Sequence, residues 1–419
     1  MRHFAIILAA TTMLSGGQAL AQSSGASASG DAALRPPVAT GAPHGADQSP
    51  AFKDQSRAPQ PATNVAVTTE IVADDLPKLW SMEFLTDGRM LVAAKDGAMH
   101  IVSTDGTVGE ALAGVPDVDA RGQGGLLDIA LAPDFAESRT IFFSFSEPRE
   151  GGVNGTSVAA AELRTDDANS GTLENVRVIF RQTPGYAGTK HFGSRLAFAP
   201  NGDLFVTVGE RSDTPIRDQA QDVTSGLGKI FRIRPDGSPA DGSPFVDAAD
   251  ALPEIWSYGH RNLQSAVVDD AGQLWTVEHG PKGGDELNRP EQGLNYGWPV
   301  ITYGIDYSGA PIGEGITAQD GMEQPVYYWD PVIGPSGMAQ YQGDEFPEWQ
   351  GALLIGGLVS QGLVVLQIED GRVATEERVP LDARIRDVKV GPDGAVYAVT
   401  ETRRGGSSSI LRLTAGEGG

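Results

Sequence analysis

Hydrophobic residues along this chain fall into short runs that are separated by turn residues. Residues 82–92 illustrate the pattern, since two apolar runs flank a Thr86-Asp87-Gly88 turn. The same arrangement of strand, turn and strand returns in five further stretches: 127–143, 196–208, 266–277, 338–366 and 388–399. Short apolar runs bounded by Asp, Asn, Pro and Gly predict β-strands joined by tight turns. Because stretches with helical periodicity are scarce, the sequence predicts an all-β fold.

The six copies begin about 45 to 75 residues apart, at or above the usual period of a propeller blade. We therefore predict a six-bladed β-propeller with insertions on one face. The looser copy at 338–366 leaves five or seven blades as alternatives. The closing blade is expected to take its outer strand from the opposite end of the domain, near residues 65–72. No other stretch predicts a second domain, so the propeller is assigned to residues 63–419.

The N-terminus has the features of a secretory signal peptide over residues 1–21. A basic start precedes an apolar run at 4–14, and small residues follow up to Ala21. The mature protein is therefore expected to begin at Gln22 and to be periplasmic or secreted. The apolar run is too short for a membrane span, and no other stretch approaches the required length. Residues 22–62 are rich in Ala, Ser, Gly and Pro with few large apolar residues, so we expect a disordered leader.

The chain carries 55 acidic and 31 basic residues, for a formal net charge of −24. Such a negative surface repels a phosphate backbone, so nucleic acid is not expected as a partner. Calcium or a neutral ligand suits this charge better. The sequence contains no cysteine. This excludes disulfides, thiolate metal sites, a lipoprotein anchor and a cysteine nucleophile.

His191 is the first candidate for chemistry, because it lies on the loop that leads into the predicted strand at 196. Catalytic groups are commonly placed on loops held by a rigid sheet, and a neutral imidazole is the usual general base near neutral pH. A histidine without a chemical role is the alternative. Four further stretches combine polar side chains with strand ends of different repeats: 121–128, 254–262, 278–288 with 295–299, and 383–387. In a propeller such loops converge at one end of the central channel.

The arginines and glycines of these loops suggest two kinds of ligand. Arginines on separate blades would bind a small polyanion, because a guanidinium pairs with carboxylates in bidentate fashion. Glycine-freed carbonyls beside carboxylates are how a calcium site is built from oxygen ligands, although these glycines could serve turns alone. Arg384 and Arg386 alternate on one strand, so a solvated surface position is the alternative for one of them. Glu278 is expected to be an ordinary surface charge.

Five phrases of the sequence stand out together: HFGSRLAFAPNGDLFVTVGER, EIWSYGHRN, EHGPKGGDELN, NYGWP and PVYYWDPVIGPSGM. They are similar to the glucose/sorbosone dehydrogenase family, the soluble aldose sugar dehydrogenases that depend on pyrroloquinoline quinone (PQQ). The resemblance covers residues 64–415. It implies a six-bladed propeller with PQQ across the top of its channel, which agrees with the count of repeats.

The resemblance also implies roles for particular residues. His191 matches the general base that takes the proton from the anomeric hydroxyl of the sugar while hydride passes to C5 of the quinone. Arg261 matches the arginine that polarises the C5 carbonyl. The residues matched to contacts with PQQ or its pocket are Gln123, Arg261, Asn262, Arg384 and Arg386.

The implied calcium sites come from the third and fourth phrases. Gly280 and Pro281 resemble the pair whose backbone carbonyls hold the calcium ion that also binds PQQ. Glu286, with the backbone of Tyr296, resembles a second, structural calcium site. A divalent ion and an arginine make a quinone a better hydride acceptor, and an imidazole supplies the base. The matched residues are therefore of the types that this chemistry needs.

The sequence departs from the family at Val359. The family usually carries a lysine there that reaches a PQQ carboxylate, whereas the run 356–361 places valine at the matching position. A charge-assisted hydrogen bond contributes about 1.5–3 kcal/mol, so its loss predicts a roughly tenfold to hundredfold weaker PQQ affinity. Lys190 and Lys95 are the candidates to compensate.

The leading hypothesis is an exported dehydrogenase, dependent on PQQ and calcium, that oxidises the anomeric carbon of aldoses to lactones. Its electrons would pass to an external acceptor, a cytochrome or a quinone. A second hypothesis is a calcium-dependent propeller hydrolase such as a lactonase, which would need acidic ligands where these loops carry arginine. A third is a propeller that has lost PQQ and binds a glycan or protein without catalysis. Val359 favours this third hypothesis, and the joint presence of His191, Gln123 and the arginines argues against it.

Overall fold

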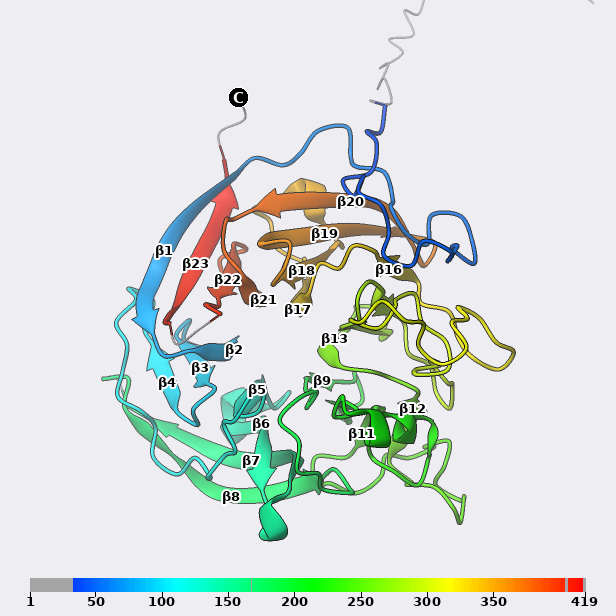
Figure 1. Ribbon diagram of the computed structural model, residues 1–419. Helices are drawn as coiled ribbons and strands as arrows, with labels where there is room; N and C mark the ends of the chain where they lie inside the picture. The colour runs from blue at the N-terminus through cyan, green and yellow to red at the C-terminus, as the bar shows by residue number, and fades with distance from the viewer. Residues whose placement is uncertain (1–32, 167, 404–405, 417–419) are drawn as a thin grey trace, which may run out of the picture. The chain divides into compact units, whose positions relative to one another are not determined.

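The computed structural model describes residues 33–166, 168–403 and 406–416. The expected signal peptide, residues 1–21, and the first part of the expected leader, residues 22–32, lie outside the described residues. The main unit begins at Leu34, and its six small antiparallel sheets form a ring (Figure 1). The prediction of an all-β, six-bladed β-propeller is confirmed.

Within a blade the strands follow one another along the chain. Blade 1 holds β2 (Leu79–Phe84), β3 (Met90–Ala94) and β4 (Met99–Val102). Blade 2 holds β5 (Leu126–Leu131), β6 (Thr140–Pro148), β7 (Asn154–Thr165) and β8 (Gly171–Arg181). Blade 3 holds β9 (Leu196–Phe198), β10 (Leu204–Val208), β11 (Lys229–Ile233) and β12 (Ile255–Tyr258).

The second half of the ring is built in the same way. Blade 4 holds β13 (Leu263–Val268), β14 (Leu274–Glu278), β15 (Asp285–Asn288) and β16 (Tyr327–Trp329). Blade 5 holds β17 (Pro335–Gln340), β18 (Leu353–Gly357), β19 (Gly362–Glu369) and β20 (Arg372–Pro380). Blade 6 holds β21 (Ile385–Val390), β22 (Val396–Thr400), β23 (Ser408–Ala415) and β1 (Val67–Leu76).

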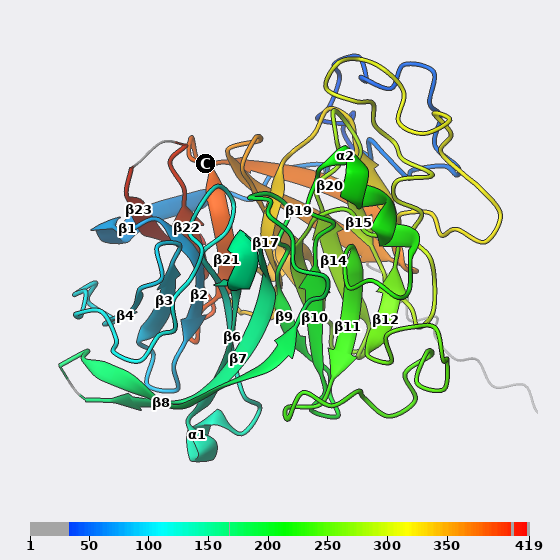
Figure 2. The same ribbon diagram turned by 60° about the horizontal axis from the view of Figure 1, so that its bottom comes forward.

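Helical structure is limited, in the described part of the chain, to short turns between strands. The four-residue helices are α1 (Phe135–Ser138) and α2 (Thr214–Arg217). The 3-10 turns are η1 (Glu150–Gly152), η2 (Asp218–Gln221) and η3 (Pro347–Trp349). Figure 2 shows α1 and α2 at opposite ends of the strands, so the two ends of the ring can be told apart by these helices. None of the helices described is long and apolar enough to cross a membrane.

The ring closes with strands from both ends of the propeller. The first strand, β1, pairs antiparallel with the last strand, β23, so that Val67 lies opposite Ala415 and Thr69 opposite Leu413. This confirms that the segment near residues 65–72 lies beside the last blade. Each of the six sequence repeats falls on the innermost strands of one blade, which explains why their number gave the number of blades.

The core lies between neighbouring blades. All five residues of β3 are buried, although the strand has no helix packed on either side. Met90 and Val92 pack towards Val399 of blade 6, whereas Leu91 packs towards Phe143 of blade 2. Because successive side chains of a strand point to opposite faces, each inner strand contributes to two interfaces. Strand β3 therefore consists of continuous apolar residues.

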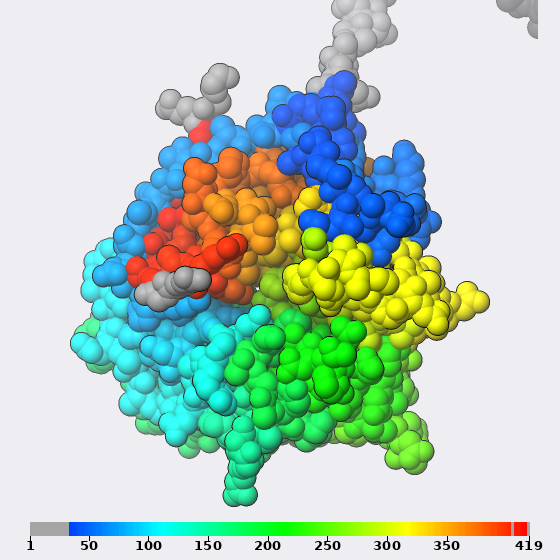
Figure 3. Space-filling view, viewed as in Figure 1, coloured from blue at the N-terminus to red at the C-terminus, as the bar shows by residue number. Residues whose placement is uncertain are grey.

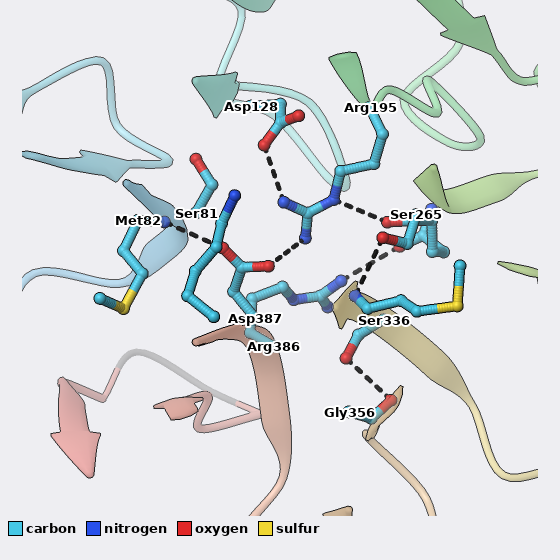
Figure 4. A network of polar contacts seen from close by, with 12 residues as sticks. Ser81, Met82, Asp128, Arg195, Ser265, Ser336, Gly356, Arg386 and Asp387 are labelled. Atoms are coloured by element: carbon cyan, nitrogen blue, oxygen red, sulfur yellow. Dashed lines mark hydrogen bonds and ion pairs between the residues drawn. The ribbon is translucent and has the colours of Figure 1, made fainter. Parts of the chain in front are cut away.

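A buried polar network joins the inner strands near the middle of the ring (Figure 4). Arg195, which precedes β9, forms ion pairs with Asp128 of β5 at 2.7 Å and with Asp387 of β21 at 2.8 Å. Its Nε donates to the backbone carbonyl of Gln264 in β13 at 2.8 Å. Asp387 also accepts a hydrogen bond from the backbone N–H of Met82 in β2 at 2.9 Å. The guanidinium thus connects four of the six blades, and Asp387 links a fifth.

The remaining blade joins the same network through serine hydroxyl groups. Ser336 of β17 donates to the backbone carbonyl of Ile385 at 2.6 Å, and the Ser265 hydroxyl accepts from the Met338 N–H at 2.9 Å. These contacts link blade 5 to blades 6 and 4 (Figure 4). The network therefore fixes the inner strands of the six blades relative to one another.

The expectation of a disordered leader over residues 22–62 is wrong for residues 33–62. Gln55 and Ala58 in this segment are 0% and 1% exposed. Gln55 donates to the carbonyl of Pro325 at 2.9 Å, and the Ala58 N–H donates to the Tyr327 hydroxyl at 2.8 Å. The prediction failed because this segment is held by backbone and amide hydrogen bonds rather than by large apolar side chains.

Candidate active site

A cavity of about 220 Å³ opens among the loops that enter the inner strands. Every blade contributes to its lining through a strand end or the loop beside it. The polar residues that line it are Lys78, Lys95, Gln123, Asn262, Gln264, His279, Arg384, Arg386 and Glu401. We call this space the cationic cavity, because four of these residues are lysines or arginines.

Glu401 is the only carboxylate among the lining residues of the cationic cavity. It accepts hydrogen bonds from Arg384 Nη2 at 3.1 Å and from Arg386 Nε at 2.5 Å, and its Oε1 lies 3.8 Å from Lys78 Nζ. Burial favours the protonated form, but Arg386 and Lys78 outweigh it and lower the pKa of Glu401 to about 2. One negative charge therefore faces four positive charges. This excess makes the cavity complementary to a ligand with several carboxylates.

Arg384 and Arg386 do not occupy solvated surface positions. Their side chains are 18% and 12% exposed, and both point to the same carboxylate, Glu401. Arg384 Nη1 donates to the carbonyl of Leu358 at 2.7 Å, and Arg386 Nη1 donates to Gln264 Oε1 at 3.1 Å. The Nε of Arg384 is buried and has no hydrogen-bond partner among the described residues. This buried donor is therefore available to an acceptor group of a ligand.

His191 lies beside this cavity on the loop before β9. Its Nδ1 lies 2.7 Å from Glu210 Oε2, and its backbone N–H donates to Gln123 Oε1 at 2.7 Å. Because the carboxylate can only accept here, Nδ1 carries the hydrogen and Nε2 keeps its lone pair. Burial lowers the pKa of His191, and Glu210 only partly offsets this effect. The imidazole is therefore neutral and oriented, as a general base requires.

Glu210 is the residue of this group that the sequence analysis missed. Its Oε2 also accepts from the Ser212 N–H at 2.6 Å, and its Oε1 accepts from Trp298 Nε1 at 3.1 Å. Burial alone would raise the pKa of Glu210, but His191 and Arg261 outweigh it and lower the pKa. Its signals in the sequence were its position just after the buried strand β10, where an unpaired charge would be costly, and its place in the phrase that begins at His191.

Arg261 contacts Trp298, whose Nε1 also donates to Glu210. Its guanidinium carbon is 5.0 Å from the centre of the Trp298 ring, and its Nη1 donates to the carbonyls of His279 at 2.8 Å and Gly280 at 2.7 Å. The Nε of Arg261 is buried without a hydrogen-bond partner in the described part of the chain. Arg261 thus has a free donor and also fixes the turn that begins at Gly280.

His191 and Arg261 do not themselves line the cationic cavity, but their neighbours do. Gly193 and Asn262 are lining residues, and His279 lines both this cavity and a smaller one that Arg261 reaches. The structure therefore brings the predicted site residues together as two adjoining groups. One group is the arginines and lysines of the cavity, and the other is the His191 and Arg261 pair around Trp298.

The smaller cavity, of about 10 Å³, has Gly280, Glu286 and Tyr296 in its lining. Burial raises the pKa of Glu286 to about 8, with a contribution from Glu278, and burial raises the pKa of Asp285 to about 7. This volume is close to that of one water molecule or ion. Buried carboxylates with raised pKa values are suited to a cation. The described residues contain no cluster of three His, Asp or Glu side chains arranged as a metal site, so a cation here would need backbone carbonyl ligands.

The expectation that Glu278 is an ordinary surface charge is wrong. The residue is 4% exposed, and its carboxylate accepts from the Arg261 N–H at 2.6 Å and from Asn288 Nδ2 at 3.0 Å. Its Oε1 also lies 3.1 Å from Nδ1 of the buried His260. Glu278 is the last residue of β14, and its carboxylate holds the backbone N–H of Arg261 in place. Overall acidity predicts surface charge on average, but it does not identify the carboxylates that are buried at strand ends.

The two lysines considered for the missing charge at Val359 occupy different places. Lys190 is 56% exposed, its Nζ lies 3.8 Å from Asp213 Oδ1, and it does not line the cationic cavity. Lys95 does line the cavity, and its Nζ donates to the carbonyl of Gly122 at 2.8 Å. Lys78, which the sequence analysis did not single out, lines it as well. Val359 is 47% exposed.

The fold and the site together define a β-propeller with a cationic cavity beside an oriented histidine. The family model described as "Glucose / Sorbosone dehydrogenase" matches residues 76–412. The chain therefore belongs to the glucose/sorbosone dehydrogenase family, as the resemblance in the sequence implied.

Several relatives of this chain carry a name or a solved structure. The chain is 43% identical over 351 residues to aldose sugar dehydrogenase YliI of Escherichia coli, covering 82% of this chain and 92% of the relative. The crystal structure of the soluble aldose sugar dehydrogenase from Escherichia coli in its apo form matches with a TM-score of 0.78 and 40% identity, over 84% of this chain and 100% of that one. The PQQ-bound aldose sugar dehydrogenase from Streptomyces coelicolor matches with a TM-score of 0.69 and 27% identity, over 84% and 99%.

Proposed function

We propose that this protein is a PQQ-dependent aldose sugar dehydrogenase that oxidises the anomeric carbon of an aldose to a lactone. The observation that carries the proposal is the cationic cavity, where four cations surround a single carboxylate next to the oriented His191. PQQ carries three carboxylates, so its charge complements this excess. When bound, it supplies the hydride acceptor for the reaction.

The protein's own part in the reaction centres on His191 and Glu210. With Nδ1 hydrogen-bonded to Glu210 at 2.7 Å, Nε2 of His191 takes the proton of the anomeric hydroxyl. The carboxylate stabilises the imidazolium that forms, because the charge-assisted hydrogen bond strengthens as the ring gains charge. Trp298 and Ser212 hold Glu210 in place. Arg261 has a free Nε, which would donate to the group that gains negative charge.

Binding of PQQ is assigned to the residues that line the cationic cavity. Arg384 and Arg386 provide two guanidinium groups held in position by Glu401. Lys95 and Lys78 add positive charge from blade 1 and take the place of the lysine that the family carries at the position of Val359. The position of Lys190 does not support its expected role in cofactor binding. The neutral lining residues assigned to cofactor contacts are Gln123 and Asn262.

Calcium is assigned to the turn that begins at Gly280. The backbone carbonyls of Gly280 and Pro281 are proposed ligands of the ion that contacts PQQ, and Glu286 with the backbone of Tyr296 is proposed to form the second site. The raised pKa of Glu286, about 8, supports a cation there because it reflects burial of this carboxylate beside a second one, Glu278. Calcium would supply Lewis-acid polarisation and neutralise this charge.

The proposed location is the periplasm or the exterior, after cleavage of a signal peptide near Ala21. Electrons are proposed to leave the enzyme for an external acceptor such as a cytochrome or quinone. The basic lining of the cavity argues against a calcium-dependent lactonase, because that enzyme would need acidic ligands in the channel. A binding protein without catalysis would have no use for the His191–Glu210 pair and the free Arg261 donor.

The test is reconstitution of the purified protein with calcium and PQQ, followed by dye reduction with glucose and a panel of other aldoses. His191→Ala is measured in parallel, with His100→Ala as control because His100 only contacts the carbonyl of Gly109 in blade 1. We expect saturable activity that is lost in His191→Ala and kept in the control. PQQ that neither binds nor supports turnover in excess would overturn the proposal in favour of the binding protein.

A further inference from the structure

Residues 35–60 form a closed loop that lies outside the region matched by the family model, residues 76–412. The backbones of Arg35 and Gln60 exchange two hydrogen bonds of 3.0 Å, and Arg35 Nε donates to the carbonyl of Pro61 at 2.8 Å. The two ends of the loop are thus fixed together, as in an Ω-loop. We call residues 35–60 the clamp loop. It is a feature of this chain beyond the common propeller.

The clamp loop grips Asp330, which follows β16. His44 Nδ1 lies 2.8 Å from Asp330 Oδ1, and the Gly45 N–H donates to Oδ2 at 2.9 Å. Arg57 Nη2 donates to the backbone carbonyl of Asp330 at 2.9 Å. Both carboxylate oxygens and the carbonyl of this residue are therefore held by the loop.

The clamp loop also holds the segment that follows Ile301. Gln48 Nε2 donates to the carbonyls of Thr302 at 3.2 Å and Gly304 at 3.3 Å. The buried Gln55 accepts from the Tyr303 hydroxyl at 3.1 Å. Figure 3 shows the N-terminal segment in blue lying against the yellow residues of this region. Hydrogen bonds of two glutamine side chains, Gln48 as donor and Gln55 as acceptor, thus join the loop to residues 302–304.

The gripped residues pack directly on the turn at 280–284. Lys282 and Ile305 exchange two backbone hydrogen bonds of 3.0 and 3.1 Å. A Cβ added to Gly284 would lie 2.6 Å from the backbone of Tyr303, and one added to Gly283 would lie 2.8 Å from the carboxyl carbon of Asp330. These distances leave no space between the two segments. A shift of residues 302–304 or of Asp330 would therefore move the turn that carries Gly280.

We propose that the clamp loop sets the position of the 280–284 turn and thereby strengthens binding of calcium, with His44 and Gln48 as its positioning residues. This inference rests on the proposed calcium sites of the preceding subsection. The clamp loop acts on the turn through two successive contacts. The loop holds residues 302–304 and Asp330, and these residues pack against the turn. Thr302 itself lines the smaller cavity together with Gly280 and Glu286. The effect thus reaches both proposed calcium positions.

The test is the full-length double variant His44→Ala/Gln48→Ala, because both side chains are partly exposed and can be truncated without opening the core. The control is Phe52→Ala, which removes a clamp-loop side chain that packs on Arg372 of blade 5 at 4.0 Å instead. Calcium affinity of the PQQ-free proteins is measured by calorimetry. Amide hydrogen exchange of residues 280–284 and 302–305 is measured in parallel.

We expect the double variant to bind calcium about three- to tenfold more weakly, since it loses the side-chain hydrogen bonds that fix the gripped segment. Its amides at 282, 284 and 305 should exchange faster, whereas Phe52→Ala should match the wild type in both measurements. Unchanged calcium affinity in a double variant whose amides exchange faster would overturn the inference. Absence of calcium binding in the wild type would instead refute the proposed calcium sites, and the inference with them.

Discussion

Replacement of Glu210 by glutamine tests the proposed proton transfer most directly. The change removes the negative charge that lies 2.7 Å from His191 Nδ1 and keeps the size of the side chain. A hydrogen bond to a charged group contributes about 1.5–3 kcal/mol, and this pair gains that energy as the imidazolium forms. Loss of the charge should therefore lower kcat about 10- to 150-fold. Because glutamine has only one accepting oxygen, the variant also loses the hydrogen bond from either Trp298 Nε1 or the Ser212 N–H.

The pH profile separates this role from a structural one. Glu210 raises the pKa of His191 against the larger effect of burial, so its removal should lower that pKa further. Activity that needs neutral His191 would then begin at a lower pH, while the maximal rate falls. Dye-reduction rates at saturating PQQ and calcium, over about pH 5 to 9, measure both changes. Glu70→Gln, with a side chain 62% exposed, is the control. An unchanged maximal rate, or a shift of the profile to higher pH, would refute the reasoning.

Three further predictions concern charge. Burial and the neighbouring cations lower the pKa of Lys95 to about 8, so PQQ affinity should fall as the pH rises through 8. Lys95→Gln should weaken PQQ binding about tenfold and remove this pH dependence, as measured by fluorescence titration. The control variant Lys190→Gln should change neither the affinity nor its pH dependence. The folded-state pKa of Glu286, about 8, exceeds its unfolded value of about 4.3. As the pH rises, the Glu286 carboxyl of the unfolded chain therefore loses its proton first. The calcium-free fold should lose stability as the pH rises between these two pKa values. Calcium should then raise Tm more at pH 8 than at pH 5, an excess that Glu286→Gln should abolish. Arg195→Met should cost about 3–5 kcal/mol in urea unfolding, because it removes the guanidinium that pairs with the buried Asp128 and Asp387; a loss below about 1 kcal/mol would contradict the proposed network.

The fold could be predicted from the sequence because each blade repeats one local pattern. The turns at 86–88 and 392–394 mark hairpins whose two strands are adjacent in sequence, so no long-range information is needed to recognise them. The pairing of β1 with β23 follows from ring closure once the number of blades is known. The clamp loop was missed because hydrogen bonds from Gln48 and Gln55 replace apolar burial there, and composition does not detect such contacts.

The site was predicted in part, for a different reason. His191 and Arg261 could be named because they lie in long phrases shared with a family. Glu210 lies in the same phrase as His191, but its role was not recognised because the contact between them spans 19 residues. Lys78 lies outside the phrases and meets Glu401 across the closure of the ring. Only the folded ring brings these charges together. The position of Lys190 in space, outside the cavity, likewise depends on the turn of the loop.

The charge of the whole chain and the charge of its cavity have opposite signs, and both are consistent with the proposed chemistry. Surface carboxylates account for the net charge of −24, but in physiological salt their field decays over about 8 Å. The cations of the cavity act at contact distance in a partly buried site, where screening is weak. Glu401 compensates one of these four cations and holds both arginines towards the cavity. The lowered pKa of Lys95 reflects this uncompensated charge, together with burial. A ligand with several carboxylates would relieve the repulsion, whereas a neutral sugar would not, which supports the proposal that the cavity takes the cofactor and that the sugar is bound by the groups around His191.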